Sequence, residues 1–105
     1  MTDSSLNALR LLYKERGKEC EDIIDSLGYY EATRNGKFED IPLCFEINEN
    51  WYLLNGFCLE EDTFLAYICD LRTGPPDCGT IDAIAIPNHI LKTVLSILNN
   101  TFANS

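Results

Sequence analysis

The segment LCFEINENWYLLNGFCLEEDTFLAYICDL, residues 43–71, decides the fold because it predicts three consecutive strands. Its apolar residues first alternate with polar ones and later occupy both sides of the chain, in runs at residues 43–48, 51–59 and 63–71. Short acidic turns are predicted between the runs, at Glu49-Asn50 and at Glu60-Glu61-Asp62. Because consecutive strands with short connections pair with each other, the segment indicates an antiparallel meander.

The flanking segments suggest further strands. Asn35-Gly36 predicts a hairpin between residues 29–34 and 37–41, since a type I′ turn needs positive φ at both central positions. Pro42 cannot donate a ladder hydrogen bond, so it places the next strand at a sheet edge or a bulge. On the other side, residues 72–79 have the Gly and Pro content of a loop, and residues 80–86 predict a short fifth strand.

Helical periodicity appears on both sides of these strands. Residues 4–27 carry an apolar stripe at helical spacing, made of Leu6, Leu9, Tyr13, Cys20, Ile23 and Leu27. Gly17 is expected to kink or divide this helix and Gly28 to end it. A second helix is predicted after Pro87, with an apolar face of Leu91, Val94, Leu95, Leu98 and Phe102, and residues 99–105 are expected to fray.

The predicted fold is therefore α+β, in one acidic domain over residues 1–105. An N-terminal helix, an antiparallel meander of four to five strands and a C-terminal helix are expected to pack in two layers. A chain of 105 residues suffices for one hydrophobic core. In organisation and charge this is similar to frataxin-like proteins and type III secretion chaperones, a likeness that carries no residue's role with it.

The negative charge is concentrated in the predicted sheet. The chain has a net charge of −9, and residues 38–71 hold eight acids and no Lys or Arg. The candidate partner-binding residues are these eight: Glu39, Asp40, Glu46, Glu49, Glu60, Glu61, Asp62 and Asp70. They either keep the protein soluble and protect strand edges, or they form a docking surface for a basic partner. Direct binding to nucleic acid or to an anionic membrane is disfavoured, because phosphates require a basic surface.

The number and spacing of the cysteines and the single histidine limit which disulfides, metal sites and cofactors the chain could hold. The odd number of cysteines, five, and their apolar surroundings predict reduced thiols. No membrane-length apolar run and no secretory leader is visible, so a cytoplasmic location is expected. With one histidine, His89, and no C-x₂-C pair, neither a metal site nor a cofactor is expected.

The leading hypothesis is a non-enzymatic, acidic protein-binding module that docks a basic partner through its sheet. It would act as an inhibitor, an immunity factor or a chaperone-like adaptor, and its partner would be a basic protein or a nucleic-acid-binding protein, for which it could be a nucleic-acid mimic. One alternative is a small enzyme or thiol-dependent protein that uses Cys78 or Cys69 with His89. Another is a structural homodimer joined by a sheet edge or by the second helix, since residues 83–105 carry one base, Lys92, and no acid.

Overall fold

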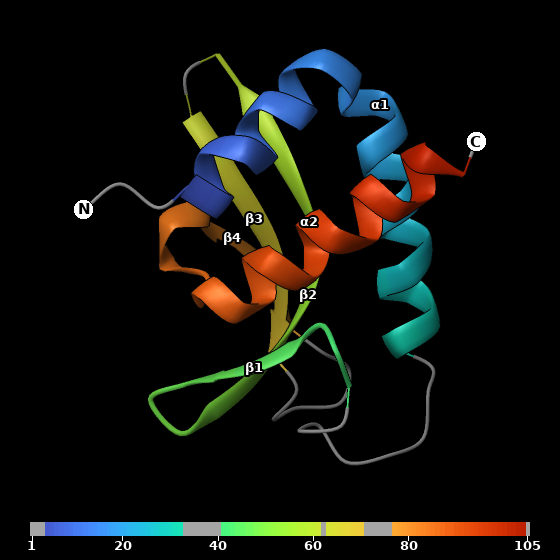
Figure 1. The fold of residues 1–105 in the computed structure, drawn as a ribbon. Helices are drawn as coiled ribbons and strands as arrows, with labels where there is room; N and C mark the ends of the chain where they lie inside the picture. The colour runs from blue at the N-terminus through green and yellow to red at the C-terminus, as the bar shows by residue number, and fades with distance from the viewer. Residues whose placement is uncertain (1–3, 33–40, 62, 71–76, 105) are drawn as a thin grey trace.

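The computed structural model describes residues 4–32, 41–61, 63–70 and 77–104. These residues form α1 (Ser4–Ala32), β1 (Cys44–Ile47), β2 (Asn50–Glu60), β3 (Thr63–Asp70), β4 (Asp77–Asp82), the 3₁₀ turn η2 (Ala83–Ala85) and α2 (Asn88–Ala103). The strands make one antiparallel sheet in the order β1-β2-β3-β4, which is a meander. In Figure 1, α2 and the first half of α1 cross in front of the sheet, while the second half of α1 runs beside β2. The predicted α+β fold in two layers is confirmed.

The α1 helix is longer than predicted. It continues through Gly28 to Ala32, so the expected end at Gly28 and the expected strand from residue 29 are wrong. A glycine inside a helix costs only about 1 kcal/mol relative to alanine, which the rest of a long helix can offset. The predicted Asn35-Gly36 turn lies outside the described residues.

A kink divides α1 where the sequence suggested one. The backbone of Arg16, next to Gly17, leaves the helical region at φ −134° and ψ 43°. The guanidinium of Arg16 lies over the ring of Phe102, 4.5 Å from its centroid. This cation–π contact joins the kink of α1 to the last turn of α2.

The first predicted turn is displaced by one residue. The β1–β2 loop consists of Asn48 and Glu49, whose φ angles are 52° and 70°, whereas the prediction was Glu49-Asn50. Positive φ at both central residues is typical of the type I′ turn, whose twist matches that of the flanking strands. As Pro42 suggested, β1 is an edge strand.

The end of the sheet also differs from the prediction. Asp77, Cys78 and Gly79 were expected in a loop, but they form the first half of β4, because each pairs with a residue of β3. The strand stops at Asp82, whose carboxylate accepts a hydrogen bond of 3.0 Å from the backbone N–H of Ile84. This cap starts η2, so residues 83–86 do not extend the strand.

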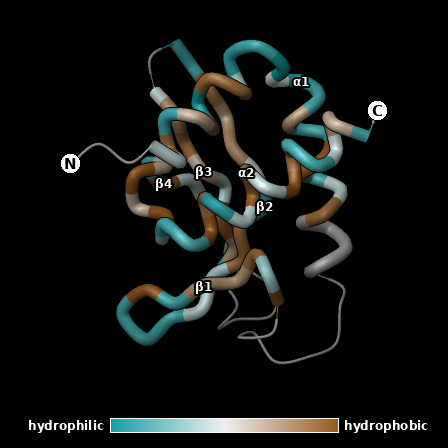
Figure 2. The backbone as a smooth tube through the Cα atoms, viewed as in Figure 1, coloured by the Kyte–Doolittle hydropathy of each residue, from teal (hydrophilic) through white to brown (hydrophobic). Residues whose placement is uncertain are grey.

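The core lies between the sheet and the helices. The rings of Phe57 and Phe64 stack across β2 and β3 at 5.1 Å, and Tyr13 of α1 meets both rings edge-on. Of the predicted apolar face of α2, Leu91, Val94 and Leu98 are fully buried, whereas Leu95 and Phe102 are partly buried. Ile90, which was not predicted, is buried as well. It runs to Ala103, so the predicted fraying from residue 99 is wrong. Figure 2 shows the hydrophobic residues gathered along the central strands and the hydrophilic ones at the β1–β2 turn.

A β-bulge interrupts the pairing of β2 with β3. Leu54 pairs with Ile68 and Gly56 pairs with Tyr67, which leaves Asn55 as the additional residue. Gly56 has a φ of 157° and lies against Ile24 and Asp25 of α1. The close approach of α1 to β2 at this position therefore requires a residue without a side chain.

Replacing Gly56 by alanine tests this close approach. The added Cβ would lie 3.0 Å from Oδ1 of Asp25, on a backbone that favours glycine. We expect G56A to lower the free energy of unfolding by about 1–3 kcal/mol in urea denaturation. Gly17 is the matched control, because a Cβ there meets no atom within 4 Å. G17A should raise the stability by about 0.5–1 kcal/mol, and equal losses in both variants would contradict the packing described.

The hydroxyl of Tyr13 makes stability depend on pH in the alkaline range. Tyr13 Oη is buried without a hydrogen bond of normal geometry, although the nearby Phe57 backbone acts to lower its pKa. Burial, the largest effect, raises the pKa well above 10, so the neutral phenol is favoured only in the folded state. The contribution of the Tyr13 hydroxyl to the free energy of unfolding is therefore constant below the unfolded-state pKa of about 10, and it falls as the pH rises above that value.

The variant Y13F should lack this alkaline loss. At pH 7 we expect it to be as stable as the wild type or up to about 1 kcal/mol more stable, because the phenylalanine ring packs without a buried hydroxyl. Above pH 10 its advantage should grow by up to about 1.4 kcal/mol per pH unit. Urea denaturation from pH 7 to 11 measures both, and parallel curves throughout would mean that Tyr13 ionises equally in the folded and unfolded protein.

Candidate functional site

The structure divides the candidate acidic residues between the two ends of β2. Glu39, Asp40 and Asp62 lie outside the described residues. Glu46 pairs with Trp51, and Glu60 ends the strand nine residues later, so these carboxylates are separated by about 30 Å along the sheet. The described acids therefore form two groups and not one continuous surface.

The first group lies at the β1–β2 hairpin. Glu46 is exposed opposite the half-buried Trp51, and Glu49 is exposed in the turn. Asp70 is partly exposed and pairs with Tyr52, which stacks on Phe45. Among the residues that the structure describes, no Lys or Arg forms an ion pair with Glu46 or Glu49. Glu46 and Trp51 project from one face of the sheet, and Tyr52 and Asp70 project from the other, because side chains alternate along β2. We call these four residues, together with Glu49 in the turn, the hairpin surface, which therefore has two faces.

The second group has basic neighbours. Glu60 accepts a hydrogen bond from the thiol of Cys58 at 3.6 Å. Glu61 borders a hollow of about 470 Å³ together with Arg10 and Lys14 of α1. Charges of both signs therefore meet at this end of β2, and the electric potential here is weaker than the acid count alone suggests.

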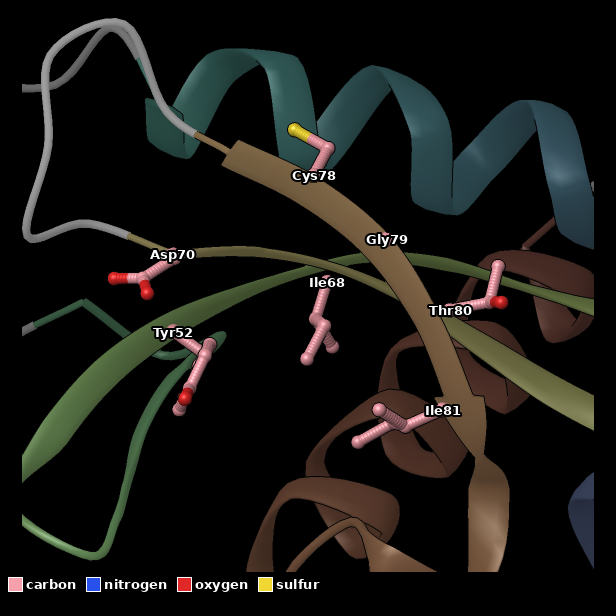
Figure 3. A pocket seen from close by; sticks show the side chains of 7 residues that line it. All are labelled: Tyr52, Ile68, Asp70, Cys78, Gly79, Thr80 and Ile81. Atoms are coloured by element: carbon pink, nitrogen blue, oxygen red, sulfur yellow. The ribbon is translucent and has the colours of Figure 1, made fainter.

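A smaller hollow of about 230 Å³ adjoins the hairpin surface. It is lined by Tyr52, Ile68, Asp70, Cys78, Gly79, Thr80 and Ile81 (Figure 3). The side chains of Ile68 and Ile81 form an apolar part, and the Asp70 carboxylate and the Tyr52 hydroxyl are the polar groups at one end. An apolar wall with one carboxylate suits a cationic side chain with a long hydrocarbon stem, such as lysine or arginine.

The oxidation state of two cysteines differs from the prediction of reduced thiols. Cys69 and Cys78, which face each other on β3 and β4, form a disulfide with a Cα–Cα distance of 4.1 Å. The prediction of reduced thiols is wrong for this pair because it assigned Cys78 to a loop. The sequence did contain a signal: a separation of nine residues around a Gly-Pro segment places two cysteines opposite each other in a hairpin.

The other three cysteines, Cys20, Cys44 and Cys58, are free thiols with little or partial exposure. Cys20 and Cys44 are buried, and Cys58 is half-buried. Burial, together with the negative charge of Glu19, raises the pKa of Cys20 from 9.0 to about 11. His89 is exposed in the first turn of α2, and its backbone carbonyl accepts a hydrogen bond from the Thr93 hydroxyl. With Cys69 and Cys78 bonded to each other, neither is a free nucleophile that His89 could activate.

Thiol titration tests the cysteine assignment. Without reductant, the unfolded protein should react with three equivalents of iodoacetamide, and after reduction with five. In the folded protein at pH 8, Cys58 should react first, because Cys20 and Cys44 are buried and the raised pKa of Cys20 leaves almost no thiolate. Mass spectrometry of the peptides identifies each site, and five reactive thiols in the unreduced, unfolded chain would contradict the disulfide.

Within residues 4–32, 41–61, 63–70 and 77–104, no three His, Cys, Asp or Glu side chains form a group that could hold a metal ion. In those ranges, neither helix combines the length and the apolar character needed to cross a membrane. Comparison with protein-family models, with curated proteins and with solved structures produced no match.

Proposed function

We propose that this protein is a non-enzymatic binding module that docks a basic protein through the hairpin surface and the hollow beside it. The observation that carries the proposal is the Asp70 carboxylate at one end of a small apolar hollow, at the end of the sheet where no described base forms an ion pair with Glu46 or Glu49. A lysine or arginine of the partner would lay its stem against Ile68 and Ile81 and direct its charge to Asp70.

The hairpin surface contains the residue types that form binding hot spots in protein interfaces. Trp51 and Tyr52 are half-buried on opposite faces of β2, so a partner that contacts both faces of the hairpin would meet an aromatic residue on each. The neighbouring carboxylates would attract a basic surface from a distance and orient it before contact. Affinity would come from the aromatic rings and the hollow, and the association rate from the charges.

The kind of partner follows from the sign of the charge. A net charge of −9 suits a basic protein, including one that binds nucleic acid, and the module would then act as an inhibitor, an immunity factor or an adaptor. A disulfide is typical of an oxidising compartment, which argues against the cytoplasmic location expected from the sequence. The apolar face of α2, one reason to expect a homodimer, is already enclosed in the core.

Two double charge reversals of equal size test the docking surface. E46K/E49K changes the hairpin surface, and E60K/E61K changes the other end of β2, so both variants move the net charge from −9 to −5. Partners of the wild type are first captured from native lysate, with alkylation to preserve the disulfide, and the affinity of each purified partner is then measured. We expect E46K/E49K to weaken binding at least about tenfold and to flatten its salt dependence, because like charges at an interface cost several kcal/mol.

The matched variant E60K/E61K shows whether binding depends on where the acids lie or only on the net charge. E60K/E61K should keep most of the affinity, since Glu61 already has Arg10 and Lys14 nearby and both acids lie at the far end of β2 from the hairpin surface. Equal losses in both variants would mean that only the total charge matters, and unchanged affinity in both would reject docking through the sheet acids. Thermal unfolding of both variants shows whether a loss of binding reflects a loss of folding.

A further inference from the structure

The two sulfur atoms of the disulfide have different surroundings. Cys78 is exposed on the edge strand β4, and in Figure 3 its side chain points away from those of Ile68 and Ile81. Cys69 lies on the interior strand β3 and is only 5% exposed. A thiolate from solution can therefore reach the sulfur of Cys78 but not that of Cys69.

The β-bulge supplies a hydrogen-bond donor to the buried sulfur. Asn55 is the additional residue of the bulge, and its side-chain Nδ2 donates to Sγ of Cys69 at 2.8 Å. A sulfur in a disulfide is a weak acceptor, whereas a thiolate accepts the same hydrogen bond much more strongly because it is charged. The amide of Asn55 thus stabilises negative charge on Cys69 once the S–S bond breaks.

We propose that Cys69–Cys78 is a thiol–disulfide exchange site, attacked at Cys78 and releasing Cys69, with a dithiol as its reductant. One thiolate of the dithiol forms a bond to Sγ of Cys78, the Cys69–Cys78 bond breaks, and its electron pair goes to Sγ of Cys69. The second thiol then attacks the mixed disulfide and releases Cys78. The dithiol is oxidised to a disulfide, the cysteine pair is reduced, and the two thiol protons of the reductant balance the two cysteine thiolates.

The proposal is independent of the docking function. It rests on the unequal exposure of the two sulfurs and on the contact between Asn55 and Cys69. Neither feature involves the charges of Glu46 and Glu49, although Cys78 also lines the hollow. The arrangement favours attack at the exposed sulfur of Cys78 and release of the hydrogen-bonded sulfur of Cys69.

Trapping the first step with a monothiol identifies the attacked sulfur. The C58S variant is used, since it removes the half-buried free thiol and keeps a hydrogen-bond donor beside Glu60. The folded protein is treated briefly with cysteamine and then unfolded in urea with excess iodoacetamide, which alkylates the released buried thiol, and its peptides are mapped by mass spectrometry. We expect cysteamine on Cys78 and the alkyl group on Cys69. The reverse pattern, an equal mixture, or no reaction before unfolding would overturn the proposal.

Reduction kinetics in variants of Asn55 test the leaving group. Dithiothreitol should reduce N55A about fivefold more slowly than the wild type, because the departing thiolate loses a hydrogen bond to a charged atom. N55D should be slower still, since it places a carboxylate of the same shape beside that sulfur. N99A, which changes an exposed asparagine of α2, should match the wild type. Circular dichroism confirms folding, and if the Asn55 variants reacted as fast as N99A, the assigned role of Asn55 would be wrong.

Discussion

The pairing of β2 with β3 is the constraint on which the other parts of the structure depend. These two strands form the longest ladder, and the stacked rings of Phe57 and Phe64 hold them together on the side that Tyr13 covers. The hairpin with β1 extends one side of this ladder and β4 extends the other. Aromatic pairs across neighbouring strands stabilise a sheet beyond the burial of their area. This ladder therefore positions both the hairpin surface and the Cys69–Cys78 disulfide.

The bulge in that ladder links structure to chemistry. An additional residue changes the direction in which the following side chains point, and here it directs the amide of Asn55 toward the sulfur of Cys69. The same irregularity brings Gly56 against Asp25 and so admits α1 to the side of β2. One local departure from regular pairing therefore serves helix packing and the surroundings of the disulfide at the same time.

The sequence predicted the periodic elements and missed the features that depend on register. Alternation in residues 43–48 and the stripe of α2 identified a strand and a helix, and Gly17 marked the kink, because each signal is local. The Gly28 stop failed because an energetic preference of about 1 kcal/mol is smaller than what a long helix gains by continuing. The hollow could not be predicted, since it requires knowing which residue faces which across two strands, and the disulfide was missed because Cys78 was assigned to a loop. The acids were found by composition, but their division between two ends of β2 was not.

The stacking of Arg16 on Phe102 has a consequence for biosynthesis. Residues 88–103 supply an enclosed side of the core and also brace the kink of the first helix. While a ribosome is still translating that segment, the sheet has no cover over part of its apolar surface. Folding must therefore finish after residue 103 has left the exit tunnel, and the nascent intermediate exposes strands that chaperones would recognise.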